Sequence, residues 1–313
     1  MSLFIENINS WNDWSKIIRR ATVFLPLVEH IVKIENLPSI KIEHMEPGYV
    51  SAVFKSGSCV IKIFAPPEIC NDFGESFDVE LFGMKWADEN GVPAPKLLAY
   101  GTVADKYDFR YMVMKYIDGK RLDDIEENLS YNDKVVVGQN MRKITDKLNR
   151  PCNNFTPYDV KQYAIDSKEW VNDNFPDSFL TERLSYIATV NIDENEKVYC
   201  HGDTHCHNIL VDDKLNVYLL DFANAMYAPD GYEQAYIASC LWCFEKPYMI
   251  GYFGDYQTED IVELCMTWLP IHAEGNNTII GNFNSADKIT SFAVLREKLH
   301  DLIEKEKTKP YDK

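Results

Sequence analysis

The chain has 313 residues, of which 46% are hydrophobic and 26% are charged, the composition of an ordinary soluble protein that can bury a large core. Its 49 acidic residues outnumber its 32 lysines and arginines, and the formal net charge of −17 argues against a nucleic-acid-binding surface, which needs a basic footprint. No uninterrupted apolar run approaches the roughly 18 residues of a membrane span. We therefore expect neither nucleic acid nor membrane as a partner.

The N-terminal residues and the cysteines predict a cytoplasmic protein. The first residues contain neither a basic region nor a small-residue cleavage site, so we expect no signal peptide. The eight cysteines are scattered, which fits reduced thiols better than a disulfide framework. Cys240 and Cys243 form a C-x-x-C pair within an aromatic stretch. We expect both to pack in a buried helix rather than to serve redox or metal chemistry.

The first third of the chain is predicted to contain mainly strands after an initial helix. Residues 1–35 are predicted to be helical, because their tryptophans and isoleucines are spaced to form one apolar face. A single later helix, Asp78–Glu89, stops at Asn90 and Gly91. Short runs of β-branched and aromatic residues predict four strands, Tyr49–Phe54, Cys59–Phe64, Lys96–Val103 and Arg110–Ile117.

After Gly119 the pattern becomes mainly helical. Ser130 to Asp133 is similar to a capping motif, and it opens a predicted helix that ends at Leu148. A short β segment, Lys197–Phe222, interrupts the helical half. The other predicted helices are Tyr158–Asn174, Ser178–Ile187, Glu259–His272 and Ala286–Lys305. Strands followed by helices predict an α+β protein with two lobes and a cleft between them.

One polar stretch has the residue types that phosphoryl transfer needs. Asp203 and Asn208 enclose four residues, the D-x-x-x-x-N spacing of kinase catalytic loops. In such a loop the carboxylate accepts the proton of the attacking hydroxyl and the amide oxygen holds Mg²⁺. Thirteen residues after Asn208, Asp221 follows a predicted hairpin and can supply a second metal ligand. The hairpin folds the chain back, so we expect Asp221 to approach Asn208.

This stretch resembles the H-G-D-x-H-x-x-N…D signature of the aminoglycoside phosphotransferase and choline kinase superfamily, relatives of protein kinases. His201, Gly202, Asp203, His205, Asn208 and Asp221 match it at the family spacing. The resemblance implies the bilobal protein-kinase-like fold, with a small antiparallel β-sheet lobe containing one key helix and a larger, mainly helical lobe. It also implies that Asp203 is the catalytic base and that Asn208 and Asp221 bind magnesium.

Weaker resemblances lie upstream in the same order. A lysine within an apolar strand is costly unless its ammonium has anionic partners, and Lys62 resembles the family lysine that contacts the phosphates of ATP. Glu80 resembles the helical glutamate that pairs with this lysine. In the nucleotide loop near residues 46–51, cradling of the phosphates would depend on Gly48 and Ser51, since the loop has one glycine.

The strand that ends near residue 117 resembles the family hinge. Met114 would be the gatekeeper, and the carbonyl of Lys115 and the N–H of Ile117 would contact adenine. The resemblance implies an N-terminal nucleotide-binding lobe over residues 1–115, a hinge over 116–119 and a C-terminal catalytic and acceptor-binding lobe over 120–313. Further on, residues 228–233 resemble the Pro-x-x-Tyr-Asp phrase that opens the next helix, with Glu233 in place of the aspartate.

Taken together, the residues and the resemblance predict an enzyme that uses ATP and Mg²⁺ to phosphorylate a hydroxyl of a small molecule. The alternative is a non-catalytic nucleotide-binding relative that acts as a sensor or scaffold. The resemblance implies an aminoglycoside, an amino-alcohol or a sugar-like molecule as the acceptor, and the sequence indicates neither which of these it is nor an oligomeric state. The acidity suits a cationic acceptor, although most acidic proteins are acidic for solubility alone.

Two other polar clusters have simpler interpretations. Cysteines and histidines between residues 200 and 207 are dense enough to suggest zinc, but Gly202 and Asp203 make a helix there unlikely, so we expect no zinc site. The acidic run over residues 123–127 follows the hinge, and we expect a solvated helix face rather than a site for an amine substrate.

Overall fold

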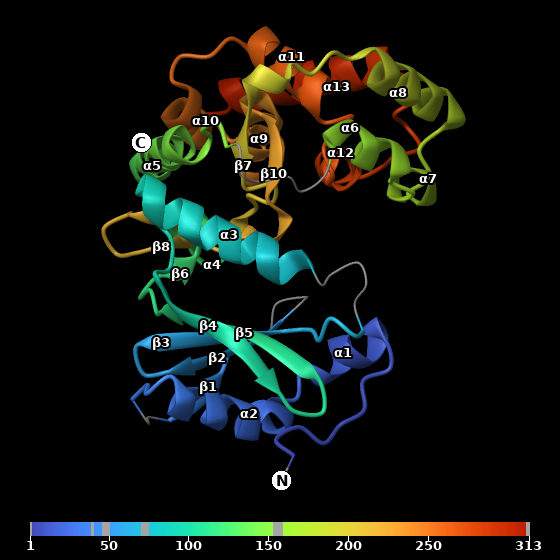
Figure 1. Ribbon diagram of the computed structural model, residues 1–313. Helices are drawn as coiled ribbons and strands as arrows, with labels where there is room; N and C mark the ends of the chain where they lie inside the picture. The colour runs from blue at the N-terminus through green and yellow to red at the C-terminus, as the bar shows by residue number, and fades with distance from the viewer. Residues whose placement is uncertain (1, 39–40, 46–50, 70–74, 153–158, 311–313) are drawn as a thin grey trace. The chain divides into compact units, whose positions relative to one another are not determined.

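The computed structural model describes residues 2–38, 41–45, 51–69, 75–152 and 159–310. The chain divides into two compact units, which Figure 1 shows in colours that follow the chain. The first unit is Met1–Asp88 with Ala94–Asp118, and the second is Glu89–Pro93 with Gly119–Lys313. Among the described residues, none of the helices is both long enough and apolar enough to cross a membrane.

The first unit contains a five-stranded antiparallel sheet with the strand order β1-β2-β3-β5-β4. The predicted hairpin joins β2 to β3, where Gly57 adopts φ +60° in the turn. The four predicted strands are present within the described residues, although β5 ends at Lys115 rather than at Ile117, and β1 was not predicted. The elements are α1 Trp11–Ile17, α2 Ala21–Ile34, β1 Ile42–His44, β2 Ser51–Ser56, β3 Cys59–Phe64, α3 Glu75–Asn90, β4 Leu97–Ala104 and β5 Asp108–Lys115.

Helices α1 and α2 cover one face of this sheet. Phe24 of α2 packs against Phe54 of β2, with ring centroids 6.1 Å apart, in a buried cluster that also holds Ile61 and Ile63 of β3. The sequence predicted one helix over residues 1–35. The chain instead breaks between α1 and α2, because Arg20 leaves the helical region with φ −105° and ψ 83°.

Helix α3 lies on the opposite face of the sheet from α2, as Figure 1 shows. Phe77 of α3 meets Phe64 of β3 edge to face, with ring centroids 5.1 Å apart. Side chains alternate along a strand, so Ile61 and Ile63 face α2 while Lys62 and Phe64 face α3. The strand period therefore directs Lys62 toward α3.

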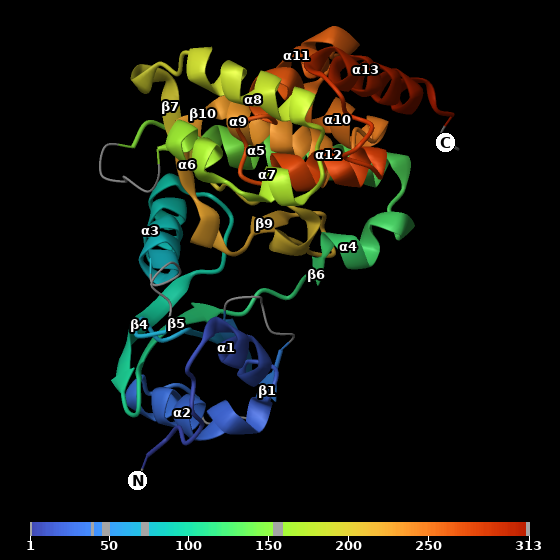
Figure 2. The same cartoon turned by 90° about the vertical axis from the view of Figure 1, so that its right-hand side faces the viewer.

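The second unit is mainly helical and contains two small sheets. Strand β7 pairs with β10, and β6, β8 and β9 form the other sheet. In Figure 2 its helices gather around α9. The elements are β6 Lys120–Arg121, α4 Leu122–Ile125, α5 Tyr131–Leu148, α6 Val160–Asp166, α7 Glu169–Asn172, α8 Asp177–Thr189, β7 Lys197–Cys200, β8 Ile209–Val211, β9 Val217–Leu219, β10 Met226–Pro229, α9 Asp230–Tyr236, α10 Lys246–Phe253, α11 Thr258–Trp268, α12 Gly275–Phe283 and α13 Phe292–Thr308.

The helix predictions in this unit are only partly right. The capping box at Ser130 and Asp133 is present at the start of α5. The single helix predicted for residues 158–174 is wrong, because Ser167 is extended, with φ −63° and ψ 113°, and separates α6 from α7. Helix α13 begins at Phe292, after its cap Ser291 and later than predicted, and α10, α12 and strand β10 were not predicted.

The expectation that both cysteines of the C-x-x-C pair pack in a buried helix is right in part for Cys240 and wrong for Cys243. Cys240 lies half-buried in a π-helical turn, Ile237–Leu241, that extends α9. The helix then stops, because Cys243 and Phe244 adopt left-handed conformations with φ 43° and 60°. Cys243 is exposed. The pair therefore marks a reversal of the chain and not the middle of a buried helix.

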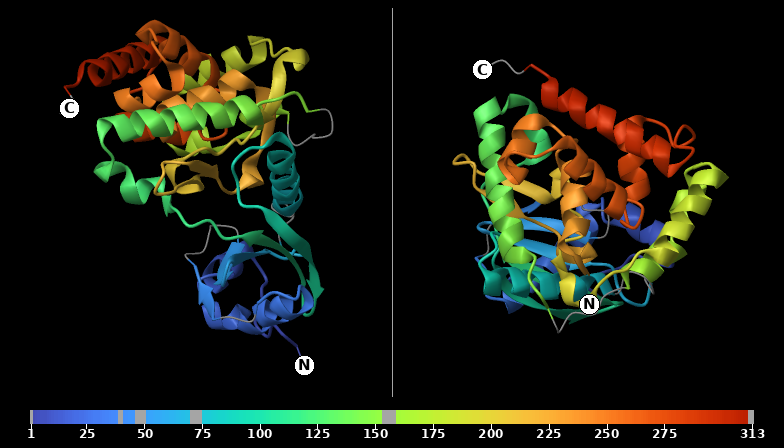
Figure 3. Two further views of the ribbon diagram at one scale, coloured as in Figure 1. Left: turned by 90° about the vertical axis from the view of Figure 1, so that its left-hand side faces the viewer. Right: turned by 90° about the horizontal axis from the view of Figure 1, so that it is seen from above.

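Helices α5 and α10 pack closely through two glycines. A Cβ on Gly138 of α5 would lie 2.5 Å from the carbonyl oxygen of Tyr248 in α10. A Cβ on Gly251 would lie 2.2 Å from the carbonyl oxygen of Val135. Figure 3 (left) shows the green helix α5 beside the gold hairpin of β8 and β9, where the side-chain amide of Asn140 donates to the Leu215 carbonyl at 2.8 Å.

Replacing Gly138 tests this packing. In an open helix, Gly→Ala stabilises by roughly 0.5–1 kcal/mol, but the clash predicts that Gly138→Ala destabilises the protein by roughly 1–3 kcal/mol. Gly281→Ala in α12 is the matched control, because a Cβ there meets no atom within 4 Å, and it should be stabilising. The free energy of unfolding from denaturant titration measures both. Equal stabilisation by the two substitutions would contradict the close contact.

Candidate active site

A buried ion pair joins β3 to α3 in the first unit. The Nζ of Lys62 lies 2.8 Å and 2.7 Å from the two carboxylate oxygens of Glu80. The two residues are 5% and 1% exposed. Taking both charges out of water is costly, and removing either partner would leave an uncompensated buried charge. The pair that the sequence predicted is therefore formed, and it holds the lysine ammonium at one place on the sheet.

The other residues predicted to contact nucleotide lie in the same unit, with one exception. Ser51 begins β2, and its buried hydroxyl has no hydrogen-bond partner among the residues described here. Met114 is buried in β5 between Val60 and Leu97 of the neighbouring strands. Lys115 ends β5 and Ile117 follows it. Gly48 lies outside the described residues.

In the second unit, the loop after β7 carries the polar stretch. Gly202 has φ +80°, and a Cβ there would lie 2.1 Å from the carbonyl oxygen of Asn224, so this position needs glycine. The fully buried carboxylate of Glu233 accepts hydrogen bonds from the Gly202 N–H at 3.2 Å and the Thr204 hydroxyl at 2.7 Å. These contacts fix the loop on either side of Asp203.

The carboxylate of Asp203 is surrounded by hydrogen-bond donors. The side-chain amides of Asn208 and Asn224 donate to its Oδ2 at 3.1 Å and 3.2 Å, and the hydroxyl of Tyr236 donates to its Oδ1 at 3.4 Å. The Nε2 of His205 lies 3.5 Å from Oδ2. Burial by itself would raise the pKa of Asp203, but the interactions with His205, with His201 and with Asn224 lower it to about 2. The carboxylate is thus ionised at neutral pH.

The two signature histidines orient the loop in different ways. His201 is fully buried, its Nδ1 accepts the Asp203 backbone N–H at 3.3 Å, and its Nε2 donates to the Leu220 carbonyl at 2.8 Å. The Nδ1 of His205 lies 3.2 Å from the backbone nitrogen of His207, and its Nε2 faces Asp203. Burial lowers the pKa of His205 and the carboxylate of Asp203 raises it, with a net upward shift to about 10.

The β8–β9 hairpin brings the two predicted metal ligands to neighbouring positions. Ile209 pairs with Leu219, and just beyond this pair the Leu220 N–H donates to the Asn208 carbonyl at 2.9 Å. Asp221 is the next residue and adopts a left-handed conformation with φ +60°. The side-chain amide of Asn208 donates to Asp203, so its carbonyl oxygen remains available to a cation.

A stack of three aromatic rings holds Tyr236, whose hydroxyl contacts Asp203. His272 lies between Tyr232 and Tyr236, with ring centroids 4.1 Å and 4.3 Å away. Its Nδ1 accepts the Glu274 backbone N–H at 3.0 Å, and its Nε2 has no hydrogen-bond partner within the described part of the chain. Burial lowers the pKa of His272 to about 3, although the charge of Asp203 opposes this shift. His272 is therefore neutral at physiological pH.

A family model described as "Phosphotransferase enzyme family" matches residues 80–264, more than half of the chain. The chain belongs to this family. The match contains Glu80, Asp203, Asn208 and Asp221, while Lys62 precedes it. Family membership makes the protein a phosphotransferase.

Solved structures share the fold of this phosphotransferase. The streptomycin–ATP ternary complex of APH(2'')-IIa is 15% identical, with 86% of this chain and 97% of that chain covered and a TM-score of 0.58. The GDP and kanamycin complex of APH(2'')-IIIa is 14% identical, with 90% and 98% covered and a TM-score of 0.59. At these identities the likeness establishes the bilobal, kinase-like fold. Comparison with curated proteins found no match.

Sequence analysis missed three residues at the active site of this phosphotransferase. Two of them contact the Asp203 carboxylate, and the third stacks on one of these two. Asn224, Tyr236 and His272 come from the segment after Asp221, from the end of α9 and from the turn after α11. None belongs to the signature. Glu233 was singled out only as a variant of a family phrase, and the contact it makes with the loop is a finding of the structure. The acidic run is not fully solvated, because Asp123 faces His207, 3.3 Å away.

The buried His272 predicts an acid dependence of stability. Above pH 6.5, its ordinary pKa, this residue is neutral in both the folded and the unfolded chain. Between pH 6.5 and 3 only the unfolded chain takes up a proton at this residue. The free energy of unfolding therefore decreases as the pH is lowered, by up to about 1.4 kcal/mol per pH unit. We expect His272→Phe to reduce this slope, measured by denaturant titration at several pH values.

His300 supplies the control, because it is exposed on α13. His300→Phe should leave the slope as it is in the unmodified protein. A His272→Phe variant that lost stability between pH 6.5 and 4 as steeply as the unmodified protein would contradict the neutral, buried state of His272.

Proposed function

We propose that this phosphotransferase transfers the γ-phosphate of ATP to a hydroxyl group of a small molecule. The observation that carries the proposal is the carboxylate of Asp203, which is held by several donors and is ionised despite its burial. An ionised carboxylate can orient an acceptor hydroxyl and take its proton during in-line attack. Structures of the same fold were solved with ATP, ADP or GDP and with aminoglycosides, which supports both the donor and the class of acceptor.

The nucleotide is assigned to the first unit and the hinge. Lys62, held by Glu80, would contact phosphate oxygens as a fixed positive charge. The buried Ser51 hydroxyl has a hydrogen-bond donor to offer a phosphate, and Gly48 would complete the loop. Adenine would lie against Met114, the Lys115 carbonyl and the Ile117 N–H. On this assignment residues 1–115 bind nucleotide, 116–119 are the hinge and 120–313 bind the acceptor.

Asn208 and Asp221 are the proposed magnesium ligands. Hard cations prefer oxygen ligands, and these residues offer one amide oxygen and one carboxylate at adjacent positions of the hairpin. When bound there, Mg²⁺ would neutralise negative charge on the phosphates. The thiol of Cys200 is a poor ligand for a soft metal, since burial raises its pKa well above the usual value and it donates to the Ala228 carbonyl.

We propose that the acceptor carries an amine. Glu274 follows His272 and acts electrostatically on Tyr236, which contacts Asp203. Burial, and then the charges of Glu274 and Asp173, raise the pKa of Glu169, so these three carboxylates form one acidic cluster. A positively charged acceptor would relieve the repulsion between them. An aminoglycoside and an amino-alcohol both fit this requirement.

A cytoplasmic location completes the proposal. Seven cysteines lie in the described residues, and none of these seven forms a disulfide. Free thiols suit a reducing compartment, where ATP is also available.

Replacing the proposed base tests the reaction. Asp203→Asn keeps the shape of the side chain but removes its basicity, so we expect kcat to fall by about 10²- to 10⁴-fold. The affinity for ATP should change little, because Asp203 is not among the residues assigned to the nucleotide or to Mg²⁺. A coupled assay of ADP release over amino-alcohols and aminoglycosides gives kcat, and calorimetry gives the ATP affinity.

Asp213→Asn is the matched control for this substitution. Asp213 is exposed in the turn of the hairpin, so the same change of charge should leave kcat unaltered. Normal turnover by Asp203→Asn would mean that Asp203 is not the base.

The magnesium assignment predicts a changed metal requirement. We expect Asp221→Asn to raise the Mg²⁺ concentration for half-maximal activity by at least about tenfold, because the substitution replaces the negatively charged ligand of the pair by a neutral amide. Chelation should abolish activity of the unmodified protein, and added Mg²⁺ should restore it. An unchanged Mg²⁺ dependence of Asp221→Asn would remove this residue from the metal site.

A further inference from the structure

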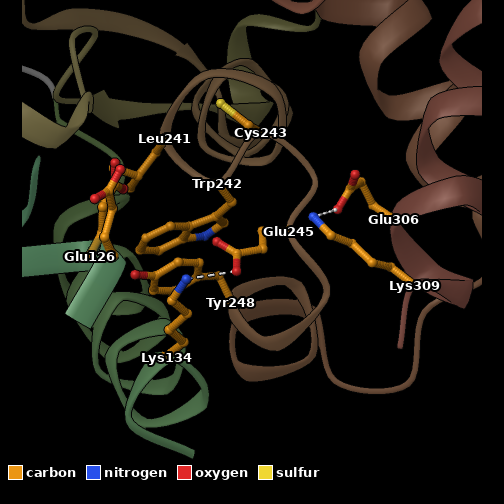
Figure 4. Close-up of a pocket in the computed structure, with 10 residues that line it drawn as sticks. Glu126, Lys134, Leu241, Trp242, Cys243, Glu245, Tyr248, Glu306 and Lys309 are labelled. Carbon is orange, nitrogen blue, oxygen red and sulfur yellow. Dashed lines mark hydrogen bonds and ion pairs between the residues drawn. The ribbon is translucent and has the colours of Figure 1, made fainter. Parts of the chain in front are cut away.

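The second unit contains a pocket of about 310 Å³ that is separate from the polar loop. Its walls come from the chain after α4, from α5, from the turn after α9, from α10 and from the end of α13 (Figure 4). Asp203, Asn208 and Asp221 are not among the described residues that line it. The phosphotransferase reaction proposed above therefore does not explain this pocket.

The pocket has an excess of negative charge. It is lined by four glutamates and two lysines. Lys134 pairs with Glu245 at 2.7 Å, and Lys309 pairs with Glu306 at 3.1 Å. Glu126 forms no hydrogen bond or ion pair with another side chain in the described part of the chain. Burial raises the pKa of Glu126, Lys134 lowers it, and Glu245 with the other nearby carboxylates raises it again. The negative charge of Glu126 is therefore not neutralised by a direct ion pair among the described residues.

Two aromatic residues form one wall of the pocket. Trp242 and Tyr248 stack face to face, with ring centroids 4.4 Å apart and planes inclined by 7°. They are 2% and 1% exposed, and neither the indole nitrogen nor the hydroxyl has a hydrogen-bond partner among the described residues. In Figure 4 the Tyr248 hydroxyl lies on the side of Glu126, and the indole nitrogen lies on the side of Glu245.

The unpartnered hydroxyl of Tyr248 indicates a ligand. A buried hydroxyl without a partner costs about 1–3 kcal/mol, and a ligand that donates to the Tyr248 oxygen would recover this free energy. An anion would be repelled by the glutamates. A neutral apolar molecule would leave the hydroxyl of Tyr248 and the carboxylate of Glu126 unsatisfied. A cation with N–H donors satisfies both.

We propose that this pocket binds a small organic ammonium ion. The ammonium would donate hydrogen bonds to the Glu126 carboxylate and the Tyr248 hydroxyl, and its carbon chain would lie against the indole of Trp242. Aromatic faces attract ammonium groups, and the attraction is strongest when water is excluded. The volume is at the lower end of the range for small-molecule sites. The source is either a free amine or a second amine of an extended acceptor.

Binding of 1,4-diaminobutane to the full chain tests this site. Titration calorimetry and the fluorescence of the tryptophans should detect saturable binding of the diamine, and 1,4-butanediol, the neutral analogue of the same length, should not bind. We expect the affinity to fall at least tenfold in Glu126→Gln and in Tyr248→Phe. Thermal unfolding without ligand checks that both variants are folded.

Glu297→Gln is the matched control, because Glu297 is exposed on α13 and does not line the pocket. The same loss of charge there should leave diamine affinity unchanged. Equal weakening by Glu297→Gln would mean that the diamine responds only to the net charge of the protein, and this overturns the site. Equal binding of the diol, or undiminished binding by Glu126→Gln, overturns it too.

A kinetic arm distinguishes the two sources. If the pocket holds an amine of the acceptor, the diamine raises the acceptor KM in a competitive manner. If the pocket binds a free amine, the diamine does not compete with the acceptor, and kcat either changes or stays the same. Binding is measured without ATP and also in Asp203→Asn, so failure of the proposed function leaves this result interpretable.

Discussion

The site depends on keeping one largely buried carboxylate ionised. Burial alone would favour the protonated form of Asp203, which could not accept a proton from a hydroxyl. The side chains of Asn208, Asn224 and Tyr236 donate to the two carboxylate oxygens, and His205 lies beside them. The interactions with His205, with His201 and with Asn224 outweigh the effect of burial and lower the pKa of Asp203 to about 2. The surrounding architecture can be understood as the means of bringing these donors to one point.

The same electrostatic problem recurs at the other functional charges. Lys62 would be unstable in an apolar strand without Glu80, so the ion pair is also a condition for the lysine to be there at all. Glu233 is fully buried and is satisfied by the loop it anchors. Glu126 is the contrasting case, because its carboxylate lies in an acidic pocket with an incomplete set of partners. Lys62 and Glu233 thus have charged or polar partners where they position the site, whereas Glu126 has an incomplete set of partners in the pocket where we propose a ligand.

Local sequence was sufficient wherever the chemistry follows from spacing along the chain. Lys62, flanked by apolar strand residues, indicated that an anionic partner lies nearby. The interval between Asp203 and Asn208 indicated a catalytic loop. The hairpin that brings Asp221 beside Asn208 was predictable, since it needs only two short apolar runs. The strand period likewise directs Lys62 to the face that α3 covers.

The features that sequence analysis did not predict depend on tertiary contacts or on the conformation of single residues. Tyr236 and His272 are far apart in the chain, and only the packing of α9 against the turn after α11 stacks them beside Asp203. The break at Ser167 and the left-handed Cys243 are single-residue departures that no periodicity reveals. The pocket near Trp242 is assembled from five separate segments, so its composition has no counterpart in the linear sequence.

Phosphorus-31 NMR tests the central claim most directly, because it identifies the product and not only the loss of ATP. The protein would be incubated with ATP, Mg²⁺ and a panel of amino-alcohols and aminoglycosides. We expect a new phosphomonoester resonance that grows in step with ADP in at least one mixture. Release of inorganic phosphate alone, or ATP that stays intact with every acceptor, would contradict the account.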